Sequence, residues 1–125
     1  MRSTTDIGGW AEEIAAEFLV EHGWTIMERN WRYKKLGEID IIAMDADTSA
    51  TGEATTVFVE VRHRTSTAYG SPEASIGPAK VGKLRRTATM YLTVARLHSK
   101  PCRFDVIAID LVGGEVVLRH YKNAL

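Results

Sequence analysis

The chain has 125 residues, of which 45% are hydrophobic and 26% charged. This balance is typical of one globular domain with a core of its own, and we expect a single domain over residues 1–125. Sixteen basic residues match sixteen acidic ones, so the net charge excludes neither a nucleic-acid nor a protein partner.

The apolar pattern predicts seven elements in the order αβββαββ. An amphipathic helix begins near Asp6, repeats apolar residues at three- and four-residue steps, and ends near Gly23. A second long helix begins near Pro78, a residue that suits the first helical position. Strands are predicted at 24–33, 37–45, 55–63, 102–111 and 115–121. Two helices around a mixed sheet of about five strands form an α/β fold.

The cysteine content and the N-terminal residues indicate the cellular setting. A single cysteine, Cys102, excludes an internal disulfide and a zinc site made of several cysteines. Because no histidine partner is evident in the sequence, we expect a buried thiol rather than a nucleophile. The first residues contain no apolar h-region, and no run is long enough to cross a membrane. We therefore expect a cytoplasmic protein with no membrane partner.

The charges are unevenly distributed along the chain. Residues 1–60 hold twelve acids and five bases, whereas residues 74–104 hold seven bases and no acid. Such asymmetry points to an anionic partner such as nucleic acid. Mutual neutralisation of the two segments across the fold is an equally good interpretation.

Two acidic residues interrupt the apolar pattern of the second and third strands. Because side chains alternate along a strand, Asp40 is expected on the face opposite Ile39 and Ile41. One face of the third strand is predicted to carry Phe58, Glu60, Arg62 and Arg64. If the two strands pair as a hairpin, Asp40 and Glu60 can lie near each other.

Two half-buried carboxylates are costly unless a cation compensates them. Carboxylates together with substrate phosphates are the usual ligands of Mg²⁺. A metal so placed can polarise a phosphodiester and lower the pKa of an attacking water. The alternative is an ion pair of Asp40 with Arg62 or Arg64, and the spacing alone modestly favours that ion pair.

Several sequence blocks together resemble a known family. The blocks are GEIDIIA, FVEVRHR, a G-S-P-E loop, K-x-x-K-x-R-R in the second helix, RFDVIAI and a terminal NAL. In this order they are similar to the YraN-like family of uncharacterised bacterial proteins, from about Gly8 to Leu125. That family is grouped with the restriction-endonuclease-like, PD-(D/E)xK nucleases and resembles archaeal Holliday junction resolvases.

The resemblance implies a restriction-endonuclease-like fold and a nucleic-acid-binding protein with an Mg²⁺- or Mn²⁺-dependent endonuclease site. DNA is the expected nucleic acid, branched DNA the expected substrate, and a homodimer would suit the two cuts that a four-way junction needs. The alternative is a non-catalytic nucleic-acid or protein interaction module with a degenerate nuclease site.

The family pattern also implies roles for particular residues. Asp40 matches the metal-binding aspartate, Glu60 matches the acid of the (D/E)xK element, and Glu12 matches the glutamate of a G-x-x-G-E pattern in the first helix. The implied metal ligands are therefore Glu12, Asp40 and Glu60. Asp40 and Glu60, with Arg62, are the implied catalytic residues. Ala11 replaces the usual second glycine of the helix pattern, a change expected to affect packing alone.

Arg62 stands where the family pattern expects the catalytic lysine. An arginine remains protonated and cannot act as a base, but it can form a charge-assisted fork to phosphate oxygens. Lys80 matches a basic residue at the start of the second helix. We assign nucleic-acid contacts to Arg64, Lys80, Lys83 and Arg86. A merely solvated helix face is an equally good interpretation for Lys83 and Arg86.

Overall fold

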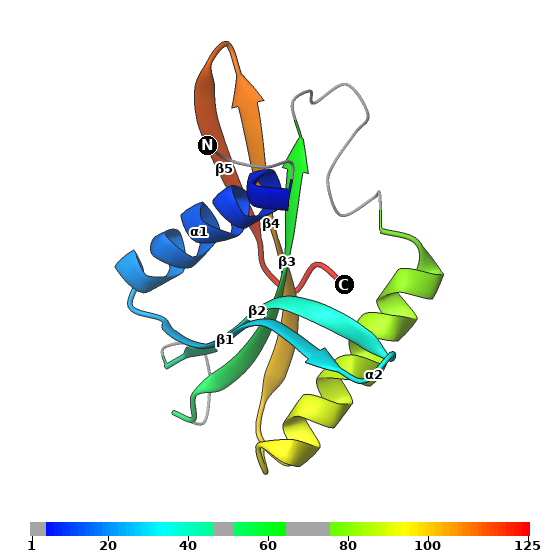
Figure 1. Cartoon of the computed structure of the whole chain (residues 1–125). Helices are drawn as coiled ribbons and strands as arrows, with labels where there is room; N and C mark the ends of the chain where they lie inside the picture. The colour runs from blue at the N-terminus through cyan, green and yellow to red at the C-terminus, as the bar shows by residue number, and fades with distance from the viewer. Residues whose placement is uncertain (1–4, 47–51, 65–75) are drawn as a thin grey trace.

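The computed structural model describes residues 5–46, 52–64 and 76–125, and it has the predicted element order (Figure 1). The helices are α1 (Thr5–Glu21) and α2 (Pro78–Val94). The strands are β1 (Thr25–Tyr33), β2 (Gly37–Asp45), β3 (Thr55–Arg64), β4 (Cys102–Val112) and β5 (Glu115–Tyr121). The side chains of residues 5–8 and of Arg64 lie outside the described part, so the predicted phosphate contact of Arg64 lies there as well.

The five strands form one mixed sheet in the order β1-β2-β3-β4-β5. Neighbouring strands are antiparallel except β3 and β4, which are parallel and are joined through α2. Parallel strands need such a crossover connection. Between β4 and β5, Gly113 and Gly114 have φ values of 58° and 82°. Positive φ at both central residues is what a tight type I′ hairpin turn requires, and a turn at this point is what the two glycines predicted.

The two helices cover opposite faces of the sheet, so the core has two layers (Figure 1). Buried residues on the α1 side are Ala11, Ala15, Ala16, Leu19, Trp24, Ile41, Ala43, Val57, Val59, Ile107 and Ile109. Buried residues on the α2 side are Ile39, Ile42, Phe58, Leu84, Ala88 and Tyr91. The alternation of β3 is confirmed, because Phe58 lies on the α2 side while Val57 and Val59 lie on the α1 side. In the described part of the chain, neither helix is long and apolar enough to cross a membrane.

One prediction about β2 is wrong. Ile39 packs on the α2 side with Ile42, although strict alternation places it with Ile41. The ladder between β2 and β3 ends at the pair Ile41 and Val59, whereas β2 stays paired with β1 through Ile39 and Trp31. Beyond Ile41 the strand follows a single neighbour, and its side chains change face. This change of face occurs at Asp40.

Two further details concern the ends of elements. A Cβ atom on Gly37 would lie 2.7 Å from Oγ1 of Thr87, so glycine at the start of β2 allows α2 to pack directly against the sheet. Cys102 is exposed, so the prediction of a buried thiol is wrong. It is the first residue of β4, paired with Thr56 at the end of the sheet and outside both buried clusters.

Candidate functional site

Asp40 lies in the fork where β2 leaves β3. The ladder between these strands ends at Ile41 and Val59. Beyond it, the N–H of Val61 donates a hydrogen bond of 2.9 Å to Oδ2 of Asp40. This carboxyl oxygen thereby takes the place of a backbone acceptor, because a buried N–H needs a partner. The strands do pair as a hairpin, the condition under which Asp40 was expected near Glu60, and this contact places Asp40 beside β3.

Glu60 lies on β3 beside Asp40 and has two cationic neighbours. Its side chain is only 6% exposed. The ammonium of Lys80, in the first turn of α2, lies 2.6 Å from Oε1, and Nη1 of Arg62 lies 3.8 Å from the same oxygen. A buried carboxylate is tolerated only with compensation of this kind. The fold thus gathers three residues to which the family pattern gave three separate roles.

Asp40 has a strongly perturbed carboxyl group. Burial, followed by the negative charges of Glu60 and Glu12, raises its pKa to about 8, against the opposing effect of the hydrogen bond from Val61. A carboxyl raised in this way holds a proton at neutral pH and forms a hydrogen bond with Glu60. Glu60 and Glu12, the other two acids predicted as metal ligands, are therefore close enough to oppose the ionisation of Asp40.

Carboxylate oxygens are the donors that Mg²⁺ and Mn²⁺ prefer, and a divalent cation would relieve the effect of the Glu60 and Glu12 charges on Asp40. In this chemical sense the residues fit a hard metal ion. The described side chains do not form a complete metal site, since no group of three or more His, Cys, Asp or Glu among them could hold a metal as placed. Glu60 is instead engaged by Lys80 and Arg62. Binding of a metal would require these side chains to rearrange.

The basic residues of α2 differ in their surroundings. Lys80, Lys83 and Arg86 are exposed, as predicted. Arg85 is engaged elsewhere, because Nη2 donates to the carbonyl of Leu125 at 2.9 Å and its guanidinium lies 5.1 Å from the centre of the Phe104 ring. Lys83 and Arg86 thus belong to the solvent-facing surface of the helix whose first turn carries Lys80.

A second polar cluster, on the α1 side, was not predicted from the residue pattern. Asp105 is fully buried and accepts hydrogen bonds from Nε of Arg103, Nε2 of His120 and the N–H of Asn123 at 3.0, 2.8 and 2.9 Å. Arg103 also reaches Asp45 at 3.2 Å. Burial alone would raise the pKa of Asp105, but these bonds outweigh it and lower the pKa. Arg103 and Asp105 are two residues apart in the apolar run of β4, which is the only sequence signal for the cluster.

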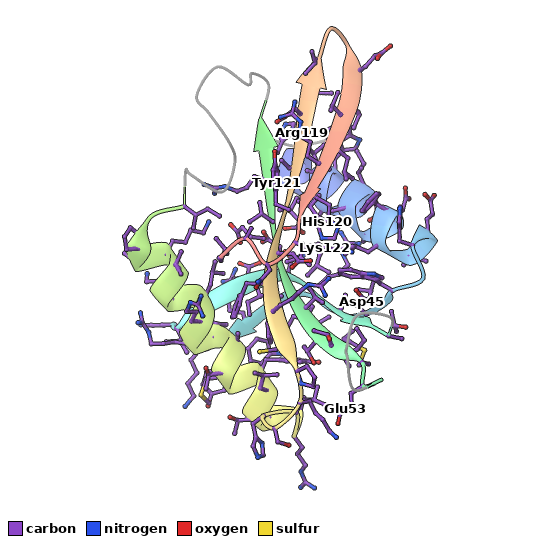
Figure 2. The ribbon with its side chains drawn as sticks, turned by 180° about the vertical axis from the view of Figure 1, so that it is seen from behind. Asp45, Glu53, Arg119, His120, Tyr121 and Lys122 are labelled. Atoms are coloured by element: carbon purple, nitrogen blue, oxygen red, sulfur yellow. The ribbon has the colours of Figure 1, made fainter. Side chains whose placement is uncertain are left out.

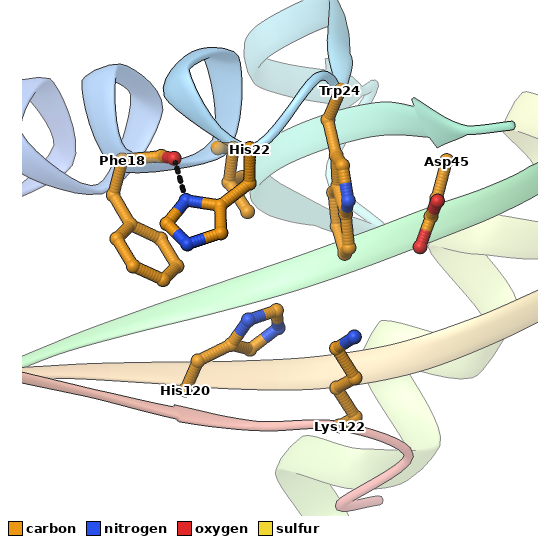
Figure 3. Close-up of a pocket in the computed structure, with 7 residues that line it drawn as sticks. Phe18, His22, Trp24, Asp45, His120 and Lys122 are labelled. Carbon is orange, nitrogen blue, oxygen red and sulfur yellow. Dashed lines mark hydrogen bonds between the residues drawn. The ribbon is translucent and has the colours of Figure 1, made fainter. Parts of the chain in front are cut away.

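A pocket of about 180 Å³ lies next to this polar cluster, at the end of α1 (Figure 3). Figure 2 labels His120 and Lys122 on the last strand and the segment after it, with Asp45 nearby. Figure 3 shows His22 and His120 on opposite walls. Each imidazole has one nitrogen in a hydrogen bond, at 2.8 Å to the Phe18 carbonyl for His22 and at 2.8 Å to Asp105 for His120. The residues lining this pocket do not include Asp40 or Glu60, so it is separate from the acidic fork.

The chain is similar to a group of bacterial proteins over nearly its whole length. Residues 11–109 match the model of the uncharacterised protein family UPF0102. A UPF0102 protein of Persephonella marina is 44% identical over 94% of this chain and 90% of its own length. UPF0102 proteins of Pelobacter propionicus and Bifidobacterium longum are 42% and 40% identical over 94% of this chain, and over 80% and 90% of their own lengths. With this coverage and identity, the chain belongs to the UPF0102 family, the YraN-like family that its sequence blocks resemble.

Proposed function

We propose that this protein is a metal-dependent endonuclease of the restriction-endonuclease-like type that acts on branched DNA in the cytoplasm. The observation that carries the proposal is the acidic fork: Asp40 and Glu60, brought together where β2 leaves β3, with Glu12 near enough to raise the pKa of Asp40. Such a set of acids next to cationic side chains suits a divalent metal and a phosphodiester together.

Each residue has a distinct part in this mechanism. Glu12, Asp40 and Glu60 would hold Mg²⁺ or Mn²⁺, which supplies polarisation of the phosphodiester and a more acidic water. Arg62, beside Glu60, neutralises charge on a phosphate oxygen by a charge-assisted hydrogen bond. It cannot accept a proton, because a guanidinium stays charged.

Positive charge along α2 supports the DNA part of the proposal. Lys80, Lys83 and Arg86 are exposed on α2, whose first turn contacts the acidic fork through Lys80. Cations so placed bind phosphates on either side of the cleaved bond irrespective of sequence. Arg64, at the end of β3, is proposed for the same role. A homodimer would present two such sites to a four-way junction, and the mass of the complex with a junction tests it.

A second candidate function is supported by one specific observation. Glu60 already has two cationic neighbours, at 2.6 and 3.8 Å, and an ion-pair network of this kind is complete without a metal. In this interpretation the protein is a non-catalytic module that binds nucleic acid or another protein.

A cleavage assay separates the two candidates. Purified protein is incubated with Mn²⁺ or Mg²⁺ and with labelled duplex, flap, four-way junction and single-stranded DNA. The endonuclease proposal expects metal-dependent cuts, most of them on a branched substrate, and their loss in Asp40→Asn. This variant keeps an oxygen that can accept the hydrogen bond of Val61. Intact substrate under all conditions, with binding retained, would favour the module.

A further inference from the structure

The contact between Lys80 and Glu60 joins two elements that are far apart in the sequence. Lys80 is the third residue of α2, which begins at Pro78, and Glu60 lies on β3. Their charged atoms are 2.6 Å apart, whereas Nη1 of Arg62 is 3.8 Å from the same oxygen. The nearer cation at the buried carboxylate is therefore a lysine supplied by the helix.

The two partners of this ion pair differ in their freedom. The side chain of Glu60 is 6% exposed and that of Lys80 is 47% exposed. Lys80 stands on a firmly packed helix, because Leu84 and Ala88 are buried against the sheet and Gly37 lets the helix approach β2 closely. A lysine on such a base has a fixed Cα and a four-carbon stem that can swing toward solvent. The buried side chain of Glu60 cannot turn toward solvent in this way.

Simple charge accounting shows what a metal would do to this pair. Three ionised carboxylates and a divalent cation leave one net negative charge, which the guanidinium of Arg62 neutralises. The ammonium of Lys80 then adds the single positive charge that attracts a phosphodiester. Before metal binding the same ammonium compensates Glu60, so it occupies an oxygen that a metal ligand must offer.

Building on the proposed function, we propose that Lys80 exchanges with the metal at Glu60. Its ammonium holds the carboxylate in place in the metal-free protein, and would move to a phosphate oxygen of the bound DNA when Glu60 serves as a metal ligand. In this way Lys80 supplies the ammonium that position 62, an arginine, lacks. No covalent bond changes in this step, since one ionic contact is replaced by another.

The exchange predicts opposite effects of one substitution on two measurements. Lys80→Met keeps the length of the side chain and removes the charge. The variant should bind Mn²⁺ about tenfold more tightly than the wild type, because a competing unit charge a few ångströms away is lost. It should cleave at least about 100-fold more slowly, because a charge next to the phosphate is lost. Lys80→Arg keeps the charge, and its Mn²⁺ affinity should stay near that of the wild type.

The matched control is Lys100→Met, in a surface ion pair with Glu53 at 3.7 Å, with both side chains about half exposed. Mn²⁺ affinity is measured by titration calorimetry, cleavage on a labelled four-way junction, and folding by circular dichroism. The control should leave both quantities unchanged. Unchanged or weaker Mn²⁺ binding by Lys80→Met would overturn the exchange, as would unchanged cleavage.

The same measurements separate failure of the exchange at Glu60 from failure of the endonuclease proposal. If the wild type binds Mn²⁺ but cuts no substrate, the endonuclease proposal fails, and tighter binding by Lys80→Met still supports the exchange at Glu60. If the wild type cuts DNA but Lys80→Met matches it in both measurements, the inference fails alone. Absence of any Mn²⁺ binding by the wild type overturns the metal site and the exchange together.

Discussion

Replacing Asp40 by asparagine should make the protein more stable, and increasingly so at higher pH. The folded-state pKa of Asp40 is raised from the ordinary 3.8 to about 8 by burial, Glu60 and Glu12. Between these values the folded protein holds a proton that the unfolded chain has released, so the stability of the wild type falls as the pH rises from about 4 to 8. The asparagine side chain carries no charge at any pH and keeps an oxygen acceptor for the N–H of Val61.

The magnitude follows from the shift. A rise of about four units, at about 1.4 kcal/mol per unit, corresponds to roughly 6 kcal/mol at most. We expect the asparagine variant to gain between about 2 and 6 kcal/mol on the wild type at pH 8.5, and only about 1 kcal/mol at pH 4.5. Titrating groups away from the acidic fork are common to both proteins, so they cancel in the difference.

The assay is urea unfolding of wild type and Asp40→Asn at several pH values, with a chelator present to remove divalent cations. Glu53→Gln is the matched control, since Glu53 is 47% exposed and its ion pair with Lys100 is long at 3.7 Å. An exposed pair of this kind contributes little, so the control difference should stay near zero at every pH. A difference between Asp40→Asn and wild type that is flat from pH 4.5 to 8.5 would refute the reasoning about the acidic fork.

The remaining predictions concern the metal, the cations and the second polar cluster. Millimolar Mn²⁺ should raise the melting temperature of the wild type but not of Asp40→Asn, and no shift with Mn²⁺ or Mg²⁺ in the wild type would contradict the metal site. Cleavage should persist or increase in Arg62→Lys and fall at least about 100-fold in Arg62→Ala; equal rates in all three proteins would remove Arg62 from the mechanism. The double change Lys83→Ala, Arg86→Ala should weaken binding to junction and duplex alike and make the log–log salt slope shallower by about 2, as fluorescence anisotropy can measure, and an unchanged slope would mean a solvated face. Asp105→Asn should cost about 3 kcal/mol at neutral pH in urea unfolding, because Asp105 is buried and bonded to cations. The pKa of Asp105 is lowered, so its stabilisation exists above about pH 4 and is lost as the pH falls below that value; a neutral variant as stable as wild type would contradict this.

Much of the fold was predictable because alternation and helical periodicity are local properties. The alternation that put Phe58 and Glu60 on one face of β3 predicted that Asp40 approaches Glu60 if β2 and β3 pair as a hairpin, and the two strands do pair in this way. The same argument failed at Ile39, since strict alternation assumes a strand paired regularly on both sides. The failure is informative, because the ladder ends where Asp40 enters the fork.

The contacts that complete the site could not be predicted, because they join separate elements. The family pattern marked Lys80 as a basic residue, but only the crossover through α2 brings it to 2.6 Å from Glu60. Asp105 lies within the apolar run of β4, and its partner His120 comes from β5. Sequence spacing carries no information on such distances until the register of the parallel strands is known.

The ion pair of Lys80 with Glu60 has opposite meanings in the two candidate functions. In a non-catalytic module the pair is permanent, so removing the ammonium leaves a buried carboxylate with only the more distant Arg62 to compensate it, and stability must fall. In an endonuclease the pair exists only until a metal binds. Removing the ammonium then leaves the carboxylate of Glu60 available as a metal ligand. The loss of stability in Lys80→Met should then be recovered by added Mn²⁺, because binding to the folded state offsets it by mass action. Recovery by Mn²⁺ is therefore expected where Glu60 is a metal ligand, and a loss of stability that Mn²⁺ leaves unchanged favours the permanent ion pair.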